Sequence, residues 1–121
     1  MTTHLESVVS THVPVCRLAD LHPDRGVAAL VDRCQVAIFL LSGTREVLAV
    51  SHRDPFTGAN VIARGLVGSR NDVPTVTSPL HKQVFDLRTG RCLDEPEVSL
   101  QTWPVRVTGD VVEIGGPGAG L

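Results

Sequence analysis

Apolar residues occur along this chain in short runs, and turn residues interrupt these runs at close intervals. Short runs with alternating apolar and polar positions predict β-strands, whereas an amphipathic helix repeats its apolar residues every three or four positions. We expect strands over residues 13–18, 27–31, 34–41, 46–51, 74–77, 83–87, 91–93, 103–108 and 111–114. No long helix is expected. The pattern predicts an all-β domain, either an antiparallel β-sandwich or a small barrel.

Turn residues predict how these strands connect. Residues 32–33 and 42–45 form tight hairpin connections, so that three successive strands make a meander. Residues 109–110 form the last hairpin turn. Between residues 53 and 69, one proline and three glycines interrupt any strand ladder: Pro55, Gly58, Gly65 and Gly68. We therefore expect one long loop over residues 53–69.

The two ends of the chain differ in composition from its middle. Residues 1–12 are polar and residues 115–121 are rich in glycine, so we expect flexible segments on either side of one domain over residues 13–114. The longest apolar run, residues 36–41, is far shorter than the roughly 18 residues that cross a membrane. The first residues lack the basic and apolar regions of a secretory signal, which predicts a cytoplasmic protein without a membrane partner.

Charge and cysteine content narrow the class of protein further. A net charge of −2 gives no reason to expect a nucleic acid partner. Residues 52–91 include six basic and three acidic residues, so this block carries a local excess of three positive charges. The three cysteines, Cys16, Cys34 and Cys92, are far apart and odd in number. This spacing argues against a disulfide framework and against a zinc site, and it predicts structural thiols.

Two segments carry the most specific pattern in the sequence. Residues 54–61 are Asp-Pro-Phe-Thr-Gly-Ala-Asn-Val, and residues 78–90 are Ser-Pro-Leu-His-Lys-Gln-Val-Phe-Asp-Leu-Arg-Thr-Gly. Together they resemble the two cluster-binding loops of a Rieske domain, in which each loop supplies one cysteine and one histidine to a [2Fe–2S] cluster. The resemblance implies the Rieske-like iron–sulfur protein fold, with both loops at one end of the domain.

The sequence departs from the Rieske pattern at three of the four ligand positions. Asp54 and Ser78 stand where the cysteines would be, Phe56 stands at the first histidine, and only His81 matches a ligand. Two thiolates hold one iron of such a cluster and two imidazoles hold the other, so the remaining residues cannot assemble it. We expect no cofactor, no metal and no catalytic residue in this chain.

With these replacements, the two loop sequences are similar to those of a known family. Asp-Pro-Phe-x-Gly-Ala-Asn-Val, then Arg64-Gly65, then Ser-Pro-Leu-x-Lys-Gln-x-Phe-Asp-Leu-x-Thr-Gly resembles the small subunits of bacterial NAD(P)H nitrite reductases. The resemblance covers residues 13–114. It implies a non-catalytic subunit of an oxidoreductase that acts in nitrate assimilation. The implied partner is a large subunit that carries FAD, a [4Fe–4S] cluster and sirohaem and reduces nitrite to ammonium.

Individual residues at the degenerate loops permit several interpretations. Phe56 is expected to fill the space of the missing ligand and cluster, as a buried ring. Arg53, Arg64, His81 and Lys82 are candidates for docking an acidic partner surface, with a solvated rim as the equally weighted alternative. Metal binding by His81 or His52 is disfavoured because no second ligand lies at a suitable spacing. Trp103 is either an interface anchor or a core residue, and the sequence does not separate the two.

Two other functions compete with the nitrite reductase subunit. The first is a Rieske-type ferredoxin that carries electrons, which the missing thiolates at positions 54 and 78 disfavour. The second is a binding module built on a degenerate Rieske scaffold and unrelated to nitrogen metabolism. Only the amino-acid sequence of the two loops argues against this second alternative.

Overall fold

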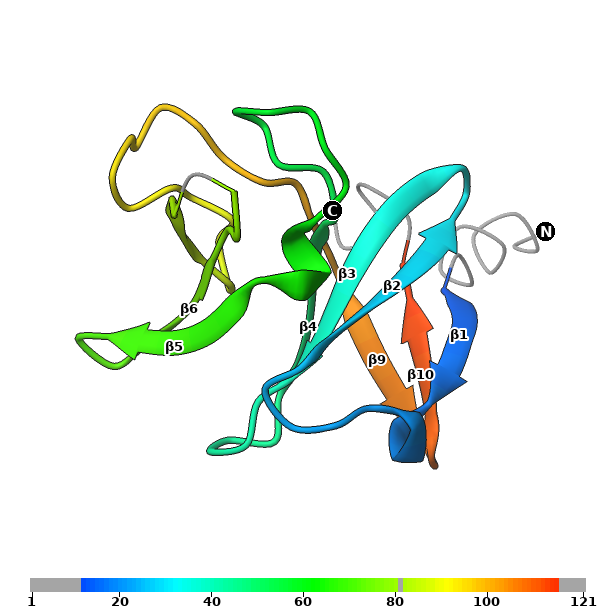
Figure 1. Ribbon diagram of the computed structural model, residues 1–121. Coiled ribbons are helices and arrows are strands. Elements are labelled where there is room, and N and C mark those ends of the chain that lie inside the picture. The colour runs from blue at the N-terminus through cyan, green and yellow to red at the C-terminus, as the bar shows by residue number, and fades with distance from the viewer. Residues whose placement is uncertain (1–11, 81, 116–121) are drawn as a thin grey trace, which may run out of the picture.

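The computed structural model describes residues 12–80 and 82–115, which fold into three antiparallel sheets (Figure 1). The first sheet has the order β1-β10-β9, the second β2-β3-β4-β8 and the third β5-β6-β7. The strands are β1 (Val13–Arg17), β2 (Gly26–Val31), β3 (Cys34–Leu40), β4 (Val47–Ser51), β5 (Leu66–Arg70), β6 (Val73–Thr77), β7 (Val84–Asp86), β8 (Thr102–Trp103), β9 (Val105–Thr108) and β10 (Val111–Ile114). The predicted all-β antiparallel architecture is confirmed.

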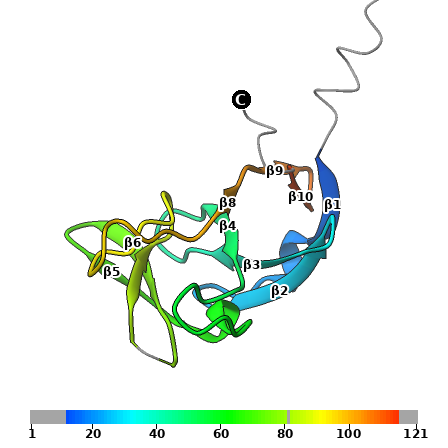
Figure 2. The same cartoon turned by 90° about the horizontal axis from the view of Figure 1, so that it is seen from above.

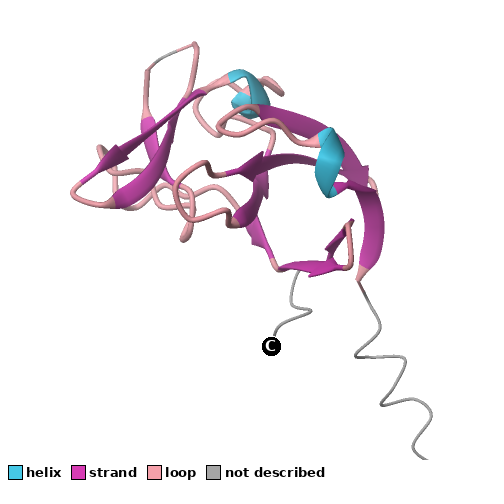
Figure 3. Ribbon diagram, turned by 90° about the horizontal axis from the view of Figure 1, so that it is seen from below, coloured by secondary structure: helices cyan, strands magenta, loops and turns pink. Residues whose placement is uncertain are grey.

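Helical structure in the described residues is confined to two single turns, η1 (Leu18–Asp20) and η2 (Ile62–Arg64), which Figure 3 shows in cyan. The turn η2 packs against the second sheet beside Gly26. A Cβ atom at position 26 would lie 2.3 Å from the carbonyl oxygen of Ala63, so the close approach of η2 to β2 requires glycine. No helix in residues 12–80 or 82–115 has the length and apolar character of a membrane span.

The second sheet lies between the other two, as the view from above shows (Figure 2). Its central strand β3 alternates between two cores. Val36, Ile38 and Leu40 belong to the cluster shared with β10, and the side chains between them belong to the cluster shared with the third sheet. This arrangement explains the uninterrupted apolar run of residues 36–41, because a strand buried on both faces has no polar side.

The predicted long strand over residues 103–108 is wrong in one respect. Trp103 pairs with Ala49 in the second sheet, whereas Val105 pairs with Ile114 in the first sheet. Pro104 separates the two short strands because proline has no N–H group to donate to a ladder. The chain thus crosses from one sheet to the other at Pro104.

The predicted loop over residues 53–69 is also partly wrong, because strand β5 begins at Leu66. β5 pairs with β6 over its full length, from Leu66 opposite Thr77 to Arg70 opposite Val73. Conversely, the expected strand over residues 91–93 is reduced to isolated bridges, one of which joins Cys92 to Phe85. The first strand starts at Val13 and the last ends at Ile114. The expected flexible segments, apart from residues 12 and 115, lie outside the described residues.

Candidate functional site

The first degenerate loop follows β4 and closes on its own backbone. Arg53 and Asn60 form an antiparallel bridge at its base. The Asp54 N–H donates to the Ala59 carbonyl at 2.8 Å, and the Gly58 N–H donates to the Asp54 carbonyl at 2.7 Å. Gly58 adopts a φ of +79°, a left-handed conformation that glycine accepts without strain. The loop is therefore a defined turn that holds Asp54 at its inner side.

The second loop joins β6 to β7 and is organised around Ser78. The Ser78 N–H donates to the Gln83 carbonyl at 2.9 Å, and the Lys82 N–H donates to the Ser78 carbonyl at 3.1 Å. The Leu80 N–H approaches the Ser78 hydroxyl oxygen at 3.4 Å. Lys82 adopts a φ of +60°, which costs a non-glycine residue roughly 1 kcal/mol. Nothing is described for His81, which falls outside the described residues.

A buried hydrogen bond joins the two loops. The Ser78 hydroxyl donates to Oδ2 of Asp54 at 2.5 Å, and both residues are fully inaccessible to solvent. The second carboxyl oxygen, Oδ1, accepts the N–H of Phe56 at 2.8 Å. Hydrogen bonds to a carboxylate are stronger than those between neutral groups, and they gain strength where water is excluded. Two of the degenerate ligand positions thus contact each other directly and bridge the loops.

The expected burial of Phe56 is not what the structure shows. Its side chain is 36% exposed, and its ring lies 6.3 Å from that of Phe85 at a tilt of 46°. Phe85, on β7, is the fully buried member of this pair. Asp54 forms an Asx turn with the Phe56 N–H, and the partly exposed Phe56 ring lies against the buried Phe85. The ring is a partly exposed lid on Phe85 and not an internal filler.

These residues do not fit the [2Fe–2S] cluster of a Rieske site. Such a cluster takes two thiolates on one iron and two imidazoles on the other. Asp54, Phe56 and Ser78 provide none of these donors, and the Asp54 carboxyl group already uses both oxygens in hydrogen bonds. The cysteines are elsewhere: Cys16 on β1, Cys34 on β3 and Cys92 in a core cluster. Among residues 12–80 and 82–115, no three His, Cys, Asp or Glu side chains gather as a metal site would require.

The described candidate docking residues are all exposed. Arg53, Arg64 and Lys82 form no ion pair within the described part of the chain. The Arg53 guanidinium lies over Gly58, where an added Cβ atom would be 3.3 Å from Nη2. Arg64 is the last residue of η2.

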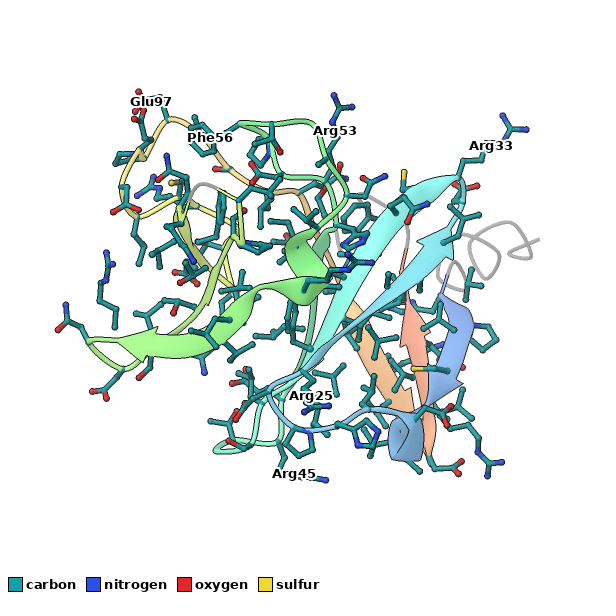
Figure 4. All side chains as sticks on the ribbon, viewed as in Figure 1. Arg25, Arg33, Arg45, Arg53, Phe56 and Glu97 are labelled. Carbon is teal, nitrogen blue, oxygen red and sulfur yellow. The ribbon has the colours of Figure 1, made fainter. Side chains whose placement is uncertain are left out.

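The expectation of a basic end omits an acidic segment that the fold places there. Residues 94–97 contain Asp94, Glu95 and Glu97, all exposed. Figure 4 shows Glu97, Phe56 and Arg53 at the same end of the molecule, with Phe56 between the two charged residues. The segment follows Leu93, whose N–H donates to the Val84 carbonyl at the start of β7. This end therefore carries both signs of charge.

His52 lies between the end of β4 and the first loop and connects this part of the chain to η2. Its side chain is buried, and Nδ1 accepts the N–H of Ala63 at 3.0 Å, which places the proton of the neutral ring on Nε2. Burial lowers the pKa of His52, and the nearby Arg64 guanidinium lowers it further. A neutral imidazole that fastens η2 to the end of β4 has a structural role.

Trp103 belongs to the core. Its side chain is 5% exposed and packs in the cluster between the first and second sheets, with Val112 and Ile114. Of the two alternatives for Trp103, the structure therefore supports the core residue and not the interface anchor. Leu80, by contrast, was not singled out by the sequence, and it is 50% exposed at the tip of the second loop.

Comparison with known proteins agrees with this geometry. Residues 11–115 match the family model of the Rieske-like [2Fe-2S] domain. The chain is 37% identical over 102 residues to the nitrite reductase (NADH) small subunit of Escherichia coli strain K12, which covers 84% of this chain and 94% of that protein. The solution NMR structure of the nitrite reductase [NAD(P)H] small subunit from Erwinia carotovora is 39% identical, with a TM-score of 0.76 and coverage of 88% and 82%.

A third relative differs in length. The nitrite reductase [NAD(P)H] large subunit of Klebsiella oxytoca contains a segment that is 36% identical to this chain over 101 residues. The match covers 84% of this chain and 10% of the large subunit. In that protein a domain of this kind is part of the same polypeptide as the large subunit.

Proposed function

Because this chain belongs to the Rieske-like family of nitrite reductase small subunits, we propose that it is the small subunit of an NAD(P)H-dependent nitrite reductase and carries no cofactor of its own. Its role is to organise or stabilise a large chain that performs the six-electron reduction of nitrite to ammonium. The large chain would hold FAD, a [4Fe–4S] cluster and sirohaem, as the family resemblance implies. The setting would be nitrate assimilation in the cytoplasm.

The hydrogen bond between Ser78 and Asp54 is the observation that carries this proposal. In a Rieske electron carrier these two positions would hold iron through sulfur. Here they hold each other, with an oxygen–oxygen distance of 2.5 Å, and both are buried. This hydrogen bond links the two loops through oxygen atoms of the chain itself. An ordered loop end without redox ligands suits a binding role better than electron transfer.

The Klebsiella oxytoca relative supports the choice of partner. A domain fused to the large subunit in one organism and encoded as a short chain in another is expected to contact the same large chain in both. We propose that docking uses the loop end with Arg53, Arg64, His81 and Lys82. The charged residues at its edge would govern the encounter rate and its dependence on ionic strength.

Co-expression with the large chain from the same source tests the proposal. We expect the two chains to co-purify, and we expect nitrite-dependent NAD(P)H oxidation to be higher with the small subunit than without it. The double variant Arg53→Glu with Lys82→Glu should weaken assembly in a salt-dependent way while the isolated domain stays folded. Separate elution together with equal turnover in both preparations would refute the subunit role.

A further inference from the structure

Two apolar side chains project from the point where the loops are joined. The N–H of Phe56 donates to Asp54 Oδ1, and the N–H of Leu80 approaches the hydroxyl of Ser78, while Asp54 and Ser78 bond each other. The same hydrogen-bonded pair therefore orders the backbone beneath both exposed side chains. Exposed apolar side chains on rigid backbone lose little conformational freedom on binding, which favours them as contact residues.

The second loop also carries a cation, Lys82, whose backbone adopts a left-handed conformation. Lys82 is exposed and adopts a φ of +60°, a conformation that glycine would adopt without strain. The turn fixes this backbone conformation, as it does at six other non-glycine residues in the described part of the chain. Lys82 and Arg53, one from each loop, form no ion pair within the described residues.

Charges of opposite sign border the apolar pair. Figure 4 shows Phe56 between Arg53 on one side and Glu97 on the other. Glu97 is exposed and makes no ion pair in the part of the chain that the structure describes. An apolar centre flanked by Arg53 on one side and Glu97 on the other favours one orientation of a partner, because the reversed orientation would bring like charges together.

We propose that Phe56 and Leu80 form the apolar centre of the contact with the nitrite reductase large chain, that Arg53 against Glu97 fixes its orientation, and that Lys82 on the second loop adds a further cation to the contact. This inference rests on the proposed function. The matching surface on the large chain has an apolar hollow with carboxylates facing Arg53 and Lys82 and a basic group facing Glu97. The two loops thus keep the exposed position of a cluster end but use it for protein contact.

The test measures binding of single-site variants to the purified large chain at fixed salt. Phe56→Ser and Leu80→Gln should each weaken binding by about tenfold or more, as expected for residues near the centre of an interface. Leu30→Gln is the matched control. Leu30 is also an exposed leucine, at 66%, but it lies on β2 in another sheet, and its replacement should leave binding unchanged.

Two further variants test the charges. Lys82→Gly should weaken binding while the urea midpoint of the isolated domain stays the same or rises, since glycine relieves the left-handed strain. Glu97→Lys should also weaken binding, because it places a cation opposite a basic group. Stronger binding by Glu97→Lys would overturn the assigned orientation and indicate a wholly acidic partner surface.

The outcomes separate this inference from the function on which it rests. If the wild-type chain fails to bind the large chain, the proposed function fails. If the wild type binds and Phe56→Ser and Leu80→Gln bind as tightly as Leu30→Gln, the contact lies elsewhere and only this inference fails. Circular dichroism and urea unfolding of each variant identify any loss of binding that comes from unfolding.

Discussion

The Ser78 hydroxyl and the Asp54 carboxyl group, 24 residues apart in the chain, meet at 2.5 Å in a fully buried position and tie two loops together. This bond links the loops directly, side chain to side chain. Its energetic weight follows from burial, because a carboxyl group that loses its partner inside the protein cannot recover a hydrogen bond from water.

We expect Ser78→Ala to lower the free energy of unfolding by about 2 kcal/mol, since the variant leaves Asp54 Oδ2 buried without its donor. Ser42→Ala provides a matched control. The Ser42 hydroxyl also donates to a carboxylate, that of Asp24 at 2.7 Å, but both residues are exposed, so the loss should stay below about 1 kcal/mol. Urea unfolding of the two variants measures the difference. Equal losses would show that the buried bond has no special weight.

The two neighbouring phenylalanines should differ sharply in their contributions to stability. Phe85→Ala removes a fully buried ring and should cost roughly 3–5 kcal/mol. Phe56→Ala removes a ring that is 36% exposed, leaves no closed cavity, and should cost about 1 kcal/mol. Urea unfolding measures both losses of stability, provided that the free energy of unfolding depends on urea concentration with the same slope in each variant. A loss at position 56 as large as that at position 85 would mean that Phe56 is an internal filler after all.

Stability should decrease as the pH falls below about 6.5, the usual pKa of histidine. The pKa of His52 is lowered in the folded chain, first by burial and then by Arg64, so the unfolded chain takes up a proton before the folded chain does. Protonation would also remove the Nδ1 acceptor for the Ala63 N–H. The contribution of His52 to stability is therefore complete at pH values above its pKa in the unfolded chain. It is lost as the pH falls through the pKa of His52 in the folded chain.

The measurement for His52 is the urea midpoint between pH 7.5 and pH 5.5, compared with that of His52→Gln. The acidic residues with shifted pKa values do not obscure this window. The pKa values of Glu46 and Glu113 are lowered by their partners Arg88 and Arg106, so these groups lose their contribution only at more acidic pH. If His52→Gln shows the same loss of stability between pH 7.5 and 5.5 as the wild type, another group causes it.

The purified chain should contain no stoichiometric iron and no acid-labile sulfide after anaerobic preparation, because oxygen and phenyl groups replace the donors that a Rieske cluster needs. Metal analysis and the visible absorption spectrum measure this directly. Stoichiometric iron with matching sulfide would contradict the proposal of a cluster-free subunit.

A positive control for this prediction is the triple variant Asp54→Cys, Phe56→His and Ser78→Cys. Positions 54 and 78 approach closely enough for their side chains to bond, so two thiolates there could share one iron. His81 would provide the fourth ligand, as the resemblance to the Rieske loops implies. We expect reconstitution with iron and sulfide to give a coloured protein. The double variant that keeps Phe56 should remain colourless because the second iron lacks a ligand.

Much of the fold was predictable from the sequence. The continuous apolar run of residues 36–41 predicted a buried strand, and β3 is buried on both faces. Strand β5 was missed because Gly65 and Gly68 suggested a loop, whereas hydrogen bonding to β6 decides its conformation. The change of sheet at Pro104 was missed because a local pattern does not show which neighbour a strand will choose.

The candidate site was predictable in its position but not in its chemistry. The loop motifs identified Asp54, Phe56 and Ser78 as degenerate ligand positions, but their contact depends on a turn in each loop. The acidic segment 94–97 reaches the same end only through the path of the chain after β7. A charge count along the sequence therefore described a basic end, and the folded chain has one with both signs.

The position of β3 has a consequence for how the domain opens. Its two faces pack into separate clusters, so neither cluster can come apart without exposing one side of the same strand. The domain should therefore unfold as one cooperative unit despite having three sheets. In hydrogen exchange, the amides of Val36–Leu40 that pair with β2 and β4 should exchange only through global unfolding, whereas the loop amides exchange through local fluctuations.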